Sequence, residues 1–195
     1  FGVTLVDQDG WISELIEKPD DMSNNLAVVG CYYFKDAATI LSAVEEQIDK
    51  ELYLKGEFYL ADAINILLKR GLKMRVEKVD VWLDSGTPES LLETNCYLLD
   101  HGYDNSDKLT PAENTVIIPP VFIHPTAQVL QSVIGPYVSV GENVTIKDCL
   151  VRESIIGPGS WLKSCRLEDS LIGHSVSLRG QTGRANLGDN SCANQ

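Results

Sequence analysis

The chain has 195 residues, of which 44% are hydrophobic, so it is long enough to bury a core in one large domain or two small ones. Its 28 acidic residues outnumber its 16 basic residues, which gives a formal net charge of −12. This balance, without a cluster of Lys and Arg, disfavours binding to nucleic acid or to an anionic membrane. Small molecules are the expected anionic ligands.

The cysteines and the termini indicate the class of protein. Five cysteines lie scattered without CxxC spacing, which disfavours a disulfide framework and a zinc site and favours a reducing cytoplasm. No apolar run approaches the roughly 20 residues that span a bilayer. The sequence starts inside a strand pattern without an initiator Met, so we expect it to be part of a longer protein.

The first part of the chain alternates strand-like and helix-like patterns. The turn "DQDG" predicts a tight hairpin between residues 2–6 and 11–16. The continuous apolar and aromatic run at residues 26–34 predicts a strand that is covered on both faces.

Three helices are expected next, each with a capping signal. Asp36 can cap a helix whose apolar face contains Ile40, Leu41, Val44 and Ile48. A second helix should follow "KGEF" and end at Gly71, with a buried stripe formed by Leu60, Ile64, Leu67 and Leu68. Residues 73–84 predict another strand, and Thr87 and Pro88 then begin a third helix with Leu91, Leu92, Cys96 and Leu99 inward. This order predicts an α/β layer structure.

The pattern changes at residues 104–114, a polar stretch that we interpret as a linker between a domain at residues 1–103 and one at residues 115–195. Beyond it, an Ile-Gly dipeptide recurs in "SVIGPY", "SIIGPG" and "SLIGHS". Apolar residues also align at a spacing of sixteen, in the two ladders Val140, Ile156, Ile172 and Ile146, Leu162, Leu178. Such a period predicts a parallel β-helix, with a string of ordinary hairpins as the alternative.

This repeat region resembles the left-handed β-helix family of hexapeptide-repeat proteins. Three hexapeptides would need a longer coil than the sixteen-residue spacing provides. One face of each coil should therefore be tightened.

Two charged residues follow apolar strand patterns, where ligands gather in open α/β sheets. Lys18 precedes Pro19 and could simply be a solvated strand end in extended geometry. Asp84 could equally be a turn-former ahead of the Thr87 cap. Both interpretations stay open on the residues alone.

The stretches "FGV", "EKPDDMSNNLAVVGCYYF", "KGEFYLADAINILLKRG" and "WLDSGTPESLLETN" together resemble the sugar-1-phosphate nucleotidylyltransferase family, of which the glucose-1-phosphate thymidylyltransferases are a type. The resemblance covers about residues 1 to 100. It implies the C-terminal portion of a Rossmann-like α/β nucleotidyltransferase domain, and longer members of the family likewise carry a β-helix tail.

The resemblance also implies roles for five residues around the sugar 1-phosphate. Glu17 would accept hydrogen bonds from sugar hydroxyls, and the compact ammonium of Lys18 would neutralise the phosphate. Gly2 would let the backbone approach the sugar, because it has no Cβ. Val28 would line the sugar pocket, and Lys55 would help to hold the phosphate.

Asp84 would coordinate Mg²⁺, a hard cation that takes oxygen ligands. The implied reaction is attack by the sugar phosphate oxygen on the α-phosphorus of a nucleoside triphosphate, with release of pyrophosphate. Lys18 and Asp84 would be the catalytic residues.

Several parts of the family pattern have no match in this chain. The glycine-rich nucleotide loop of the form GxGTRLxPxT, the base-reading segment and the second metal-binding acid are missing, so the N-terminal nucleotide-binding half is missing from the sequence. We therefore expect the chain alone to be inactive. Lys55 and Tyr59 stand where many thymidylyltransferases have Arg and Glu, so the resemblance does not determine the sugar and the nucleotide. Glucose 1-phosphate with dTTP or UTP is the favoured substrate pair.

The β-helix region leaves two further functions open. His124 and His174 could act as general bases of an acyltransferase, although a His in a turn is usually a polar surface residue. Alternatively, the region could be a non-catalytic module for oligomerisation or sugar-phosphate binding. We expect a homo-oligomer formed through the β-helix.

Overall fold

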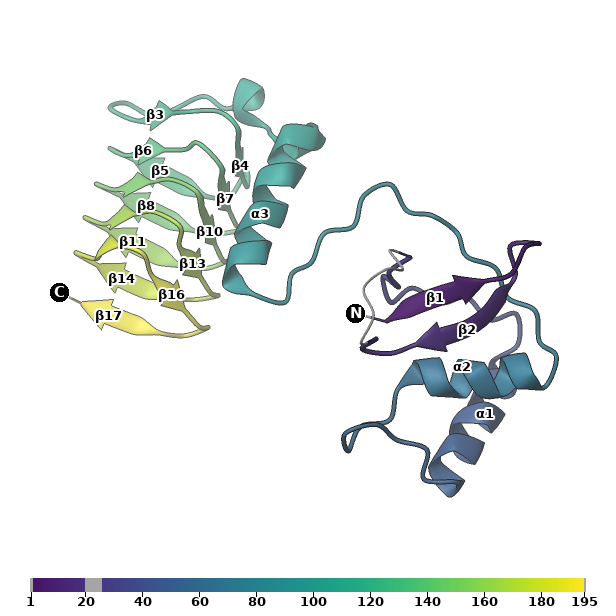
Figure 1. Ribbon diagram of the computed structural model, residues 1–195. Coiled ribbons are helices and arrows are strands. Elements are labelled where there is room, and N and C mark those ends of the chain that lie inside the picture. Colours follow the sequence, from purple (N-terminus) through teal and green to yellow (C-terminus); the bar gives the residue numbers. More distant parts are fainter. Residues whose placement is uncertain (1, 20–25, 195) are drawn as a thin grey trace. The chain divides into compact units, whose positions relative to one another are not determined.

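The computed structural model describes residues 2–19 and 26–194. The chain forms two compact units, Phe1–Trp82 and Leu83–Gln195 (Figure 1). The first unit is α/β and the second is a parallel β-solenoid, so the predicted order of fold classes is confirmed. The left-handed sense and the domain limits 1–103, 104–114 and 115–195 stay predictions.

The first unit begins with the predicted hairpin, formed by β1 (Val3–Val6) and β2 (Ile12–Ile16). The two strands pair antiparallel, with Thr4 opposite Leu15. Asp7 closes the turn, because its Oδ1 accepts hydrogen bonds of 2.9 Å from the backbone N–H groups of Asp9 and Trp11.

Helix α1 (Ala37–Asp49) is capped as predicted, since the Asp36 carboxylate accepts hydrogen bonds from the first turn. The predicted apolar face is only half right. Ile40 and Val44 pack inward beside buried Ala43, but Leu41 is 59% exposed and Ile48 is 52% exposed. The helix turns about 100° per residue, so the stripe that meets α2 continues through Ala43 rather than through Leu41 and Ile48.

Helix α2 (Leu60–Lys69) buries Ile64 and Leu67 as predicted, and half-buried Leu68 packs beside them. Leu60, which was predicted to be inward, lies in the first turn and is exposed. Gly71 ends the helix with a φ of 89° and donates its N–H to the Leu68 carbonyl.

Two predicted strands do not form among the described residues. In residues 26–34, backbone bonds to β1 are confined to the start, and Tyr33 is 86% exposed. In residues 73–84, Arg75 forms an isolated bridge with Trp11 and the apolar side chains beyond it are exposed. A strand covered on both faces needs neighbours on both sides, and the described residues supply too few of them.

The second unit begins with α3 (Pro88–Leu98), for which Thr87 and Ser90 form a reciprocal capping box. A π-helical turn, η1 (Leu99–Tyr103), and a 3-10 turn, η2 (Ser106–Lys108), follow. Part of the stretch interpreted as a linker packs on the solenoid, since the Asn105 side chain exchanges hydrogen bonds of 2.9 and 3.0 Å with the backbone of Ile123.

The solenoid contains three parallel sheets of five strands each (Figure 1). The helix-side sheet contains β4 (Val121–Ile123), β7 (Val138–Val140), β10 (Ser154–Ile156), β13 (Leu171–Ile172) and β16 (Asn186–Leu187). The long-strand sheet contains β5 (Gln128–Leu130), β8 (Thr145–Lys147), β11 (Trp161–Lys163), β14 (Ser177–Arg179) and β17 (Cys192–Asn194). The short-strand sheet contains β3 (Val116–Ile117), β6 (Val133–Ile134), β9 (Leu150–Val151), β12 (Arg166–Leu167) and β15 (Thr182–Gly183).

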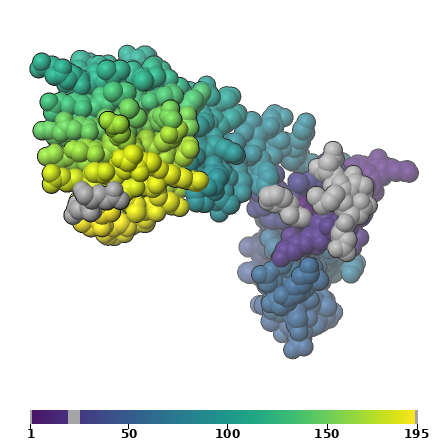
Figure 2. Space-filling model, turned by 60° about the vertical axis from the view of Figure 1, so that its left-hand side comes forward, coloured from purple at the N-terminus to yellow at the C-terminus, as the bar shows by residue number. Residues whose placement is uncertain are grey.

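The predicted ladders form the core of the solenoid. Ile156 pairs with Val140 on one side and with Ile172 on the other. The second ladder pairs in the same way through Leu162, which is completely buried. Every strand of the short-strand sheet has two residues, so this sheet is the tightened face that the coil spacing required. The coils stack in chain order, from teal to yellow in Figure 2.

The Ile-Gly dipeptides recur because successive coils approach each other closely at these turns. A Cβ on Gly157 would lie 2.6 Å from the backbone of Gly173, and a Cβ on Gly173 would lie 2.7 Å from the backbone N of Asp189. No side chain fits at such a distance, so the stacked turns require glycine.

Side chains at the corners also join one coil to the next. The Ser154 hydroxyl accepts a hydrogen bond of 3.1 Å from the N–H of Ser170, and the Ser170 hydroxyl accepts one of 3.0 Å from the N–H of Ala185. These buried corners therefore satisfy backbone donors that would otherwise lack a partner. In the described parts of the chain, every helix is too short or too polar to cross a membrane.

Candidate functional site

The predicted pair Glu17 and Lys18 directly follows β2, which is fixed to α2 by one side chain. Asn65 of α2 accepts a hydrogen bond of 2.9 Å from the Leu15 N–H and donates one of 2.7 Å to the Leu15 carbonyl. This two-point contact joins α2 to the backbone of β2 two residues before Glu17.

Lys18 lies in a small hydrogen-bonded group with two side chains far away in the sequence. Its ammonium donates to the Tyr59 hydroxyl at 2.5 Å and to the Glu57 carboxylate at 3.2 Å, and Tyr59 also donates to Glu57. The ammonium lies 4.9 Å from the centre of the Tyr59 ring. These contacts raise the pKa of Lys18, first through the hydrogen bond with Tyr59 and then through that with Glu57. The ammonium is therefore held in its charged form while 46% of the side chain remains exposed.

Lys55 lies in a tight turn that leads directly to the Lys18 group. The backbone groups of Leu54 and Glu57 exchange hydrogen bonds of 3.0 and 3.1 Å around this turn. Lys55 and Gly56 fill it with φ values of 53° and 83°, as in a two-residue hairpin turn. Because Glu57 ends the turn and pairs with Lys18, the segment that presents Lys55 is tied to Lys18.

Gly2, Val28 and Glu17 come together around the start of β1. The Val28 N–H donates a hydrogen bond of 2.9 Å to the Gly2 carbonyl. A Cβ on Gly2 would lie 2.8 Å from a carboxylate oxygen of Glu17. Because Gly2 has no Cβ, it leaves space for the Glu17 carboxylate. The segments that carry Glu17 and Val28 therefore both approach Gly2.

Glu17 also lines a pocket of about 400 Å³, together with Asp62, Asn65 and Tyr53. The pKa of Asp62 is raised, first by burial and then by the negative charge of Glu17. A pocket with several carboxylates and an amide offers hydrogen-bond acceptors to a ligand rich in hydroxyl groups.

Asp84 belongs to the second unit, where it forms a turn ahead of α3. One of its carboxylate oxygens accepts a hydrogen bond of 3.3 Å from the Gly86 N–H, and its carbonyl accepts one of 2.9 Å from the Thr94 hydroxyl. The turn-forming interpretation therefore describes its local contacts. Its predicted role as a metal ligand stays a prediction.

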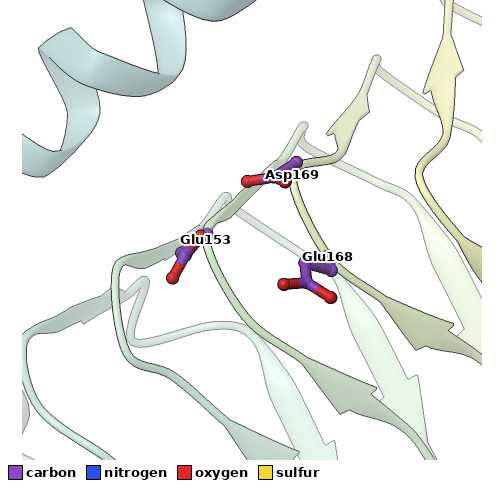
Figure 3. A group of neighbouring side chains, drawn as sticks. All are labelled: Glu153, Glu168 and Asp169. Carbon is purple, nitrogen blue, oxygen red and sulfur yellow. The ribbon is translucent and has the colours of Figure 1, made fainter.

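Three other carboxylates lie close enough together to hold a metal ion. The ligand oxygens of Glu153, Glu168 and Asp169 in the solenoid lie within 4.8 Å of one another (Figure 3). Glu168 is already paired with Arg152, and exposed acidic groups are common without a metal, so this group alone does not define a metal site.

The two predicted histidines lie in turns of the solenoid that follow strands of the helix-side sheet. The His124 ring nitrogen Nδ1 lies 2.8 Å from the Thr126 hydroxyl. The backbone of His174 accepts a hydrogen bond from Asn190. Their role as general bases stays a prediction.

Glu57, Tyr59 and Asp62 have no role predicted from the sequence. Glu57 and Tyr59 are 39 and 41 residues away from Lys18 along the chain, so spacing alone does not pair them. Glu57 lies within the "KGEF" stretch and Tyr59 directly follows it, so this stretch is the sequence signal for both residues.

Comparisons with known proteins fit this arrangement. Residues 1–101 match the family described as "Nucleotidyl transferase". The chain is 32% identical to the low-salt glycan biosynthesis nucleotidyltransferase Agl11 of Haloferax volcanii, over 91% of this chain and 54% of that protein. It is 28% identical to a glucose-1-phosphate thymidylyltransferase of Streptomyces griseus, over 99% of this chain and 59% of that protein.

The likeness extends beyond the first unit. A bifunctional sugar-1-phosphate nucleotidylyltransferase/acetyltransferase of Sulfurisphaera tokodaii is 28% identical over 96% of this chain and 51% of its own length. The chain spans about half the length of these curated relatives. With the family match over residues 1–101, the solenoid behind it and the Glu17–Lys18 stretch at the end of β2, the chain belongs to the sugar-1-phosphate nucleotidyltransferase family.

Proposed function

We propose that this chain provides the sugar-phosphate-binding part and the solenoid of a sugar-1-phosphate nucleotidylyltransferase. The observation that carries the proposal is the Lys18 group beside the Glu17 pocket. A charged ammonium and a hydroxyl-binding carboxylate are adjacent in the sequence, and a sugar 1-phosphate needs both. Glucose 1-phosphate is the favoured substrate.

Glu17 would accept hydrogen bonds from the sugar hydroxyls. Gly2 supports this role, because its missing Cβ leaves space beside the Glu17 carboxylate. Val28 would line the sugar side, where its N–H already fixes the Gly2 backbone. A carboxylate bound to neutral hydroxyls forms charge-assisted hydrogen bonds, which are stronger than neutral ones.

Lys18 and Lys55 would hold the phosphate. In the described structure the Lys18 ammonium has Tyr59 and Glu57 as partners, and 46% of its side chain remains exposed to an incoming ligand. An arriving phosphate would share or replace the Glu57 contact. Lys55, in the turn that ends at Glu57, would add a second positive charge.

The proposed reaction joins the sugar phosphate oxygen to the α-phosphorus of a nucleoside triphosphate and releases pyrophosphate. Asp84 fits one part of a Mg²⁺ site, because its side chain is exposed and the hydrogen bond that its carboxylate accepts from the Gly86 N–H is a long one of 3.3 Å. Mg²⁺ keeps several waters and needs few protein carboxylates. When bound, it would supply charge neutralisation at the reacting phosphates.

The 195 residues contain no GxGTRLxPxT-type loop for the nucleotide, so we propose that they do not catalyse this reaction by themselves. The relatives include enzymes named as thymidylyl-, uridylyl- and adenylyltransferases that act on glucose 1-phosphate. These names favour glucose 1-phosphate. The choice of dTTP or UTP is our preferred proposal for the nucleotide.

Calorimetric titration of the purified chain with glucose 1-phosphate tests the sugar-phosphate half directly. We expect saturable binding that Lys18→Met weakens at least about tenfold, the effect of losing about 1.4 kcal/mol. Lys78→Met, at an exposed lysine of the same unit outside the site, should leave it unchanged. No binding by the parent chain, or equal binding by both variants, would contradict the proposal.

A second assay tests the proposed inactivity. The chain, mixed with glucose 1-phosphate, Mg²⁺ and either dTTP or UTP, should release no more pyrophosphate than the Lys18→Met variant. Release above that background would show that the chain contains a complete catalytic site.

Two other functions remain alternatives for the solenoid. The Sulfurisphaera tokodaii relative is named as an acetyltransferase as well, which supports testing His124 and His174 for acyl transfer. Self-association is the alternative we favour, because the solenoid exposes sheet faces. A cytoplasmic location is part of this proposal, since the five cysteines are scattered without CxxC spacing.

A further inference from the structure

Two thiols lie one above the other at one corner of the solenoid. Cys149 directly precedes β9 and Cys165 directly precedes β12, while Ser132 has the equivalent place before β6. Because Leu150 pairs in register with Arg166, the two cysteines lie at matching positions on successive coils. Both side chains are buried, and both are free thiols.

A serine performs the structural role of this corner one coil earlier. The Ser132 hydroxyl donates a hydrogen bond of 2.7 Å to the Leu130 carbonyl and accepts one of 3.0 Å from the Cys149 N–H. The Cys149 thiol copies this pattern, since it donates to the Lys147 carbonyl at 3.1 Å and accepts from the Cys165 N–H at 3.3 Å. The ladder of hydrogen bonds therefore does not require sulfur. What two thiols add to it is oxidation chemistry.

The spacing of the two coils fits a disulfide. Neighbouring strands of a sheet lie about 4.8 Å apart, and a disulfide joins residues whose Cα atoms are about 4.4–6.8 Å apart. The sulfur of Cys149 already points toward the next coil, because it lies 3.3 Å from the backbone nitrogen of Cys165. The two thiols also form a hydrogen bond with each other. A bond between the sulfurs would therefore keep the coils at their present spacing.

The contact between the thiols makes them chemically unequal. Their hydrogen bond lowers the pKa of Cys165, an effect that burial opposes and that the backbone N–H of Gln181 supports. The same hydrogen bond raises the pKa of Cys149, and burial raises this pKa further. The thiolate is the nucleophilic form of cysteine. Cys165 is therefore the thiol that supplies the thiolate, and Cys149 is the thiol that keeps its proton.

Burial limits which oxidant can reach the pair. Cys149 is 5% exposed and Cys165 is completely buried, but the turn residues directly before them, Asp148 and Ser164, are exposed. The thiols thus lie one residue below the surface. A second protein or a bulky disulfide reagent does not fit at such a depth, whereas a peroxide is little larger than a water molecule. The oxidant that matches this corner is a small peroxide.

We propose that Cys149 and Cys165 are a peroxide-reactive pair that forms a disulfide between two successive coils of the solenoid. The Cys165 thiolate attacks one oxygen of hydrogen peroxide, the O–O bond breaks, and hydroxide leaves and takes up a proton, so Cys165 becomes a sulfenic acid. The Cys149 sulfur then attacks the Cys165 sulfur. The S–S bond forms as the S–O bond breaks, and the hydroxyl group leaves as water with the Cys149 proton. In total, two thiols are oxidised to a disulfide and one peroxide is reduced to two waters.

The disulfide would tie β9 to β12 by a covalent bond across sixteen residues of chain. Both strands contribute to the continuous core of the solenoid, through Val151 and Leu167. Such a bond constrains the unfolded chain and slows the local opening of the coils that it joins. Thiol reductants reverse it by exchange. This inference does not depend on nucleotidyl transfer.

Peptide mass spectrometry of the parent chain tests the proposal. The folded chain is treated with hydrogen peroxide, the remaining thiols are alkylated in denaturant, and the protein is digested with trypsin. Cleavage after lysine and arginine isolates Cys149 in peptide 148–152 and Cys165 in peptide 164–166. We expect these two peptides to be linked, with the loss of two hydrogen atoms, and to separate after treatment with dithiothreitol.

Serine variants separate the thiol chemistry from the hydrogen-bond ladder. Cys149→Ser and Cys165→Ser keep a donor and an acceptor at the corner, as Ser132 does, so both should fold, which circular dichroism checks. After peroxide treatment, Cys149→Ser should carry a sulfenic acid on Cys165 that dimedone labels once the chain is unfolded. Cys165→Ser should leave Cys149 unlabelled. The reverse pattern of labels would contradict the order of attack.

The other three cysteines provide the matched control. The triple variant Cys31→Ser/Cys96→Ser/Cys192→Ser should form the linked peptides as the parent chain does. In the oxidised parent chain, amide exchange in β9 and β12 should slow at least about tenfold, whereas peroxide should leave exchange in Cys149→Ser unchanged. A folded parent chain whose Cys149 and Cys165 stay reduced, or become linked only after unfolding in urea, would overturn the proposal. So would a link from either residue to Cys96.

Discussion

The two units of the chain differ in where each strand finds its neighbours. In the solenoid, a strand pairs with the strands one coil before and one coil after it, so sixteen residues suffice to build the next neighbour. Outside the solenoid, residues 26–34 and 73–84 have strand-like sequences but few partners among the described residues. A repeat stabilises itself locally, whereas an α/β sheet depends on segments that are distant in the sequence.

The hydrophobic cores show the same difference. The buried side chains of the solenoid form one continuous cluster along the axis. The described residues of the first unit form two smaller clusters, around Ala43 and around Ile64, while Tyr33 and Val81 remain exposed. We expect mutations to have large effects in the solenoid core and small ones in the exposed strand-like segments.

The largest effect is expected at Leu162, which is completely buried between Ile146 and Leu178. Leu162→Ala should lower the free energy of unfolding by about 2–5 kcal/mol, because it leaves a cavity in a rigid stack. Amide hydrogen exchange in β8, β11 and β14 during denaturant titration would measure it. Leu130→Ala, at a 40% exposed position of the same sheet, should cost far less. Equal losses would contradict a continuous core.

A smaller effect is expected at the corner ladder. Ser154→Ala would leave the N–H of Ser170 without its partner in a buried place, which should cost about 1–3 kcal/mol. Exchange of the Ser170 amide should become faster in the variant. Ser177→Ala, on the outward side of β14, serves as the control and should change stability by less than about 0.5 kcal/mol. An unchanged Ser170 amide would argue against the ladder.

Near-zero change is expected in the exposed segment of the first unit. Tyr33→Ser should alter the free energy of unfolding of this chain by less than about 0.5 kcal/mol, since the side chain is 86% exposed. Chemical denaturation, followed by amide exchange in α2, provides the measurement. A loss above about 2 kcal/mol would show that the segment is packed as the sequence predicted.

The smallest effect concerns the Lys18 group. Tyr59→Phe removes the hydroxyl that lowers the pKa of Glu57 and raises that of Lys18, so both pKa values should move toward the ordinary 4.5 and 10.5. The raised pKa of Lys18 stabilises the fold below 10.5 and ceases to do so as the pH rises through its folded-state value. The lowered pKa of Glu57 stabilises the fold above 4.5 and ceases to do so as the pH falls.

Side-chain NMR titration of the parent chain and of Tyr59→Phe would measure both pKa values. Tyr53→Phe, a tyrosine outside the group, is the matched control and should change neither value. Identical Lys18 titration in the parent and in Tyr59→Phe would show that the hydroxyl does not hold the ammonium.

Local signals in the sequence predicted much of the fold. The Asp36 and Thr87 caps, the hairpin turn at Asp7 and the Val140 ladder each depend on residues that are close in sequence or on a fixed period. The apolar run at residues 26–34 led to a wrong prediction of a strand. A hydrophobic strand pattern indicates that a segment needs neighbouring strands, but it does not show that they are present. The prediction that Leu41 is buried is wrong for a similar reason. Helical periodicity does not decide which stripe of α1 is buried, because that depends on where the neighbouring helix packs.

The candidate site could be predicted only in part. Glu17, Lys18, Val28 and Gly2 came from a motif, and the structure brings Gly2, Val28 and Glu17 together. The contacts of Lys18 with Glu57 and Tyr59 needed the folded chain, because they join β2 to a turn far along the sequence. For Asp84, the structure shows only its own turn, within the other unit.

Amide NMR during titration with glucose 1-phosphate tests the central claim most directly, namely that the first unit binds the sugar 1-phosphate and the solenoid serves assembly. We predict shifts at Gly2, Glu17, Lys18, Val28 and Lys55, which Lys18→Met reduces, and unchanged amides throughout the solenoid strands. Shifts confined to the solenoid, or no shifts at any concentration, would contradict the account.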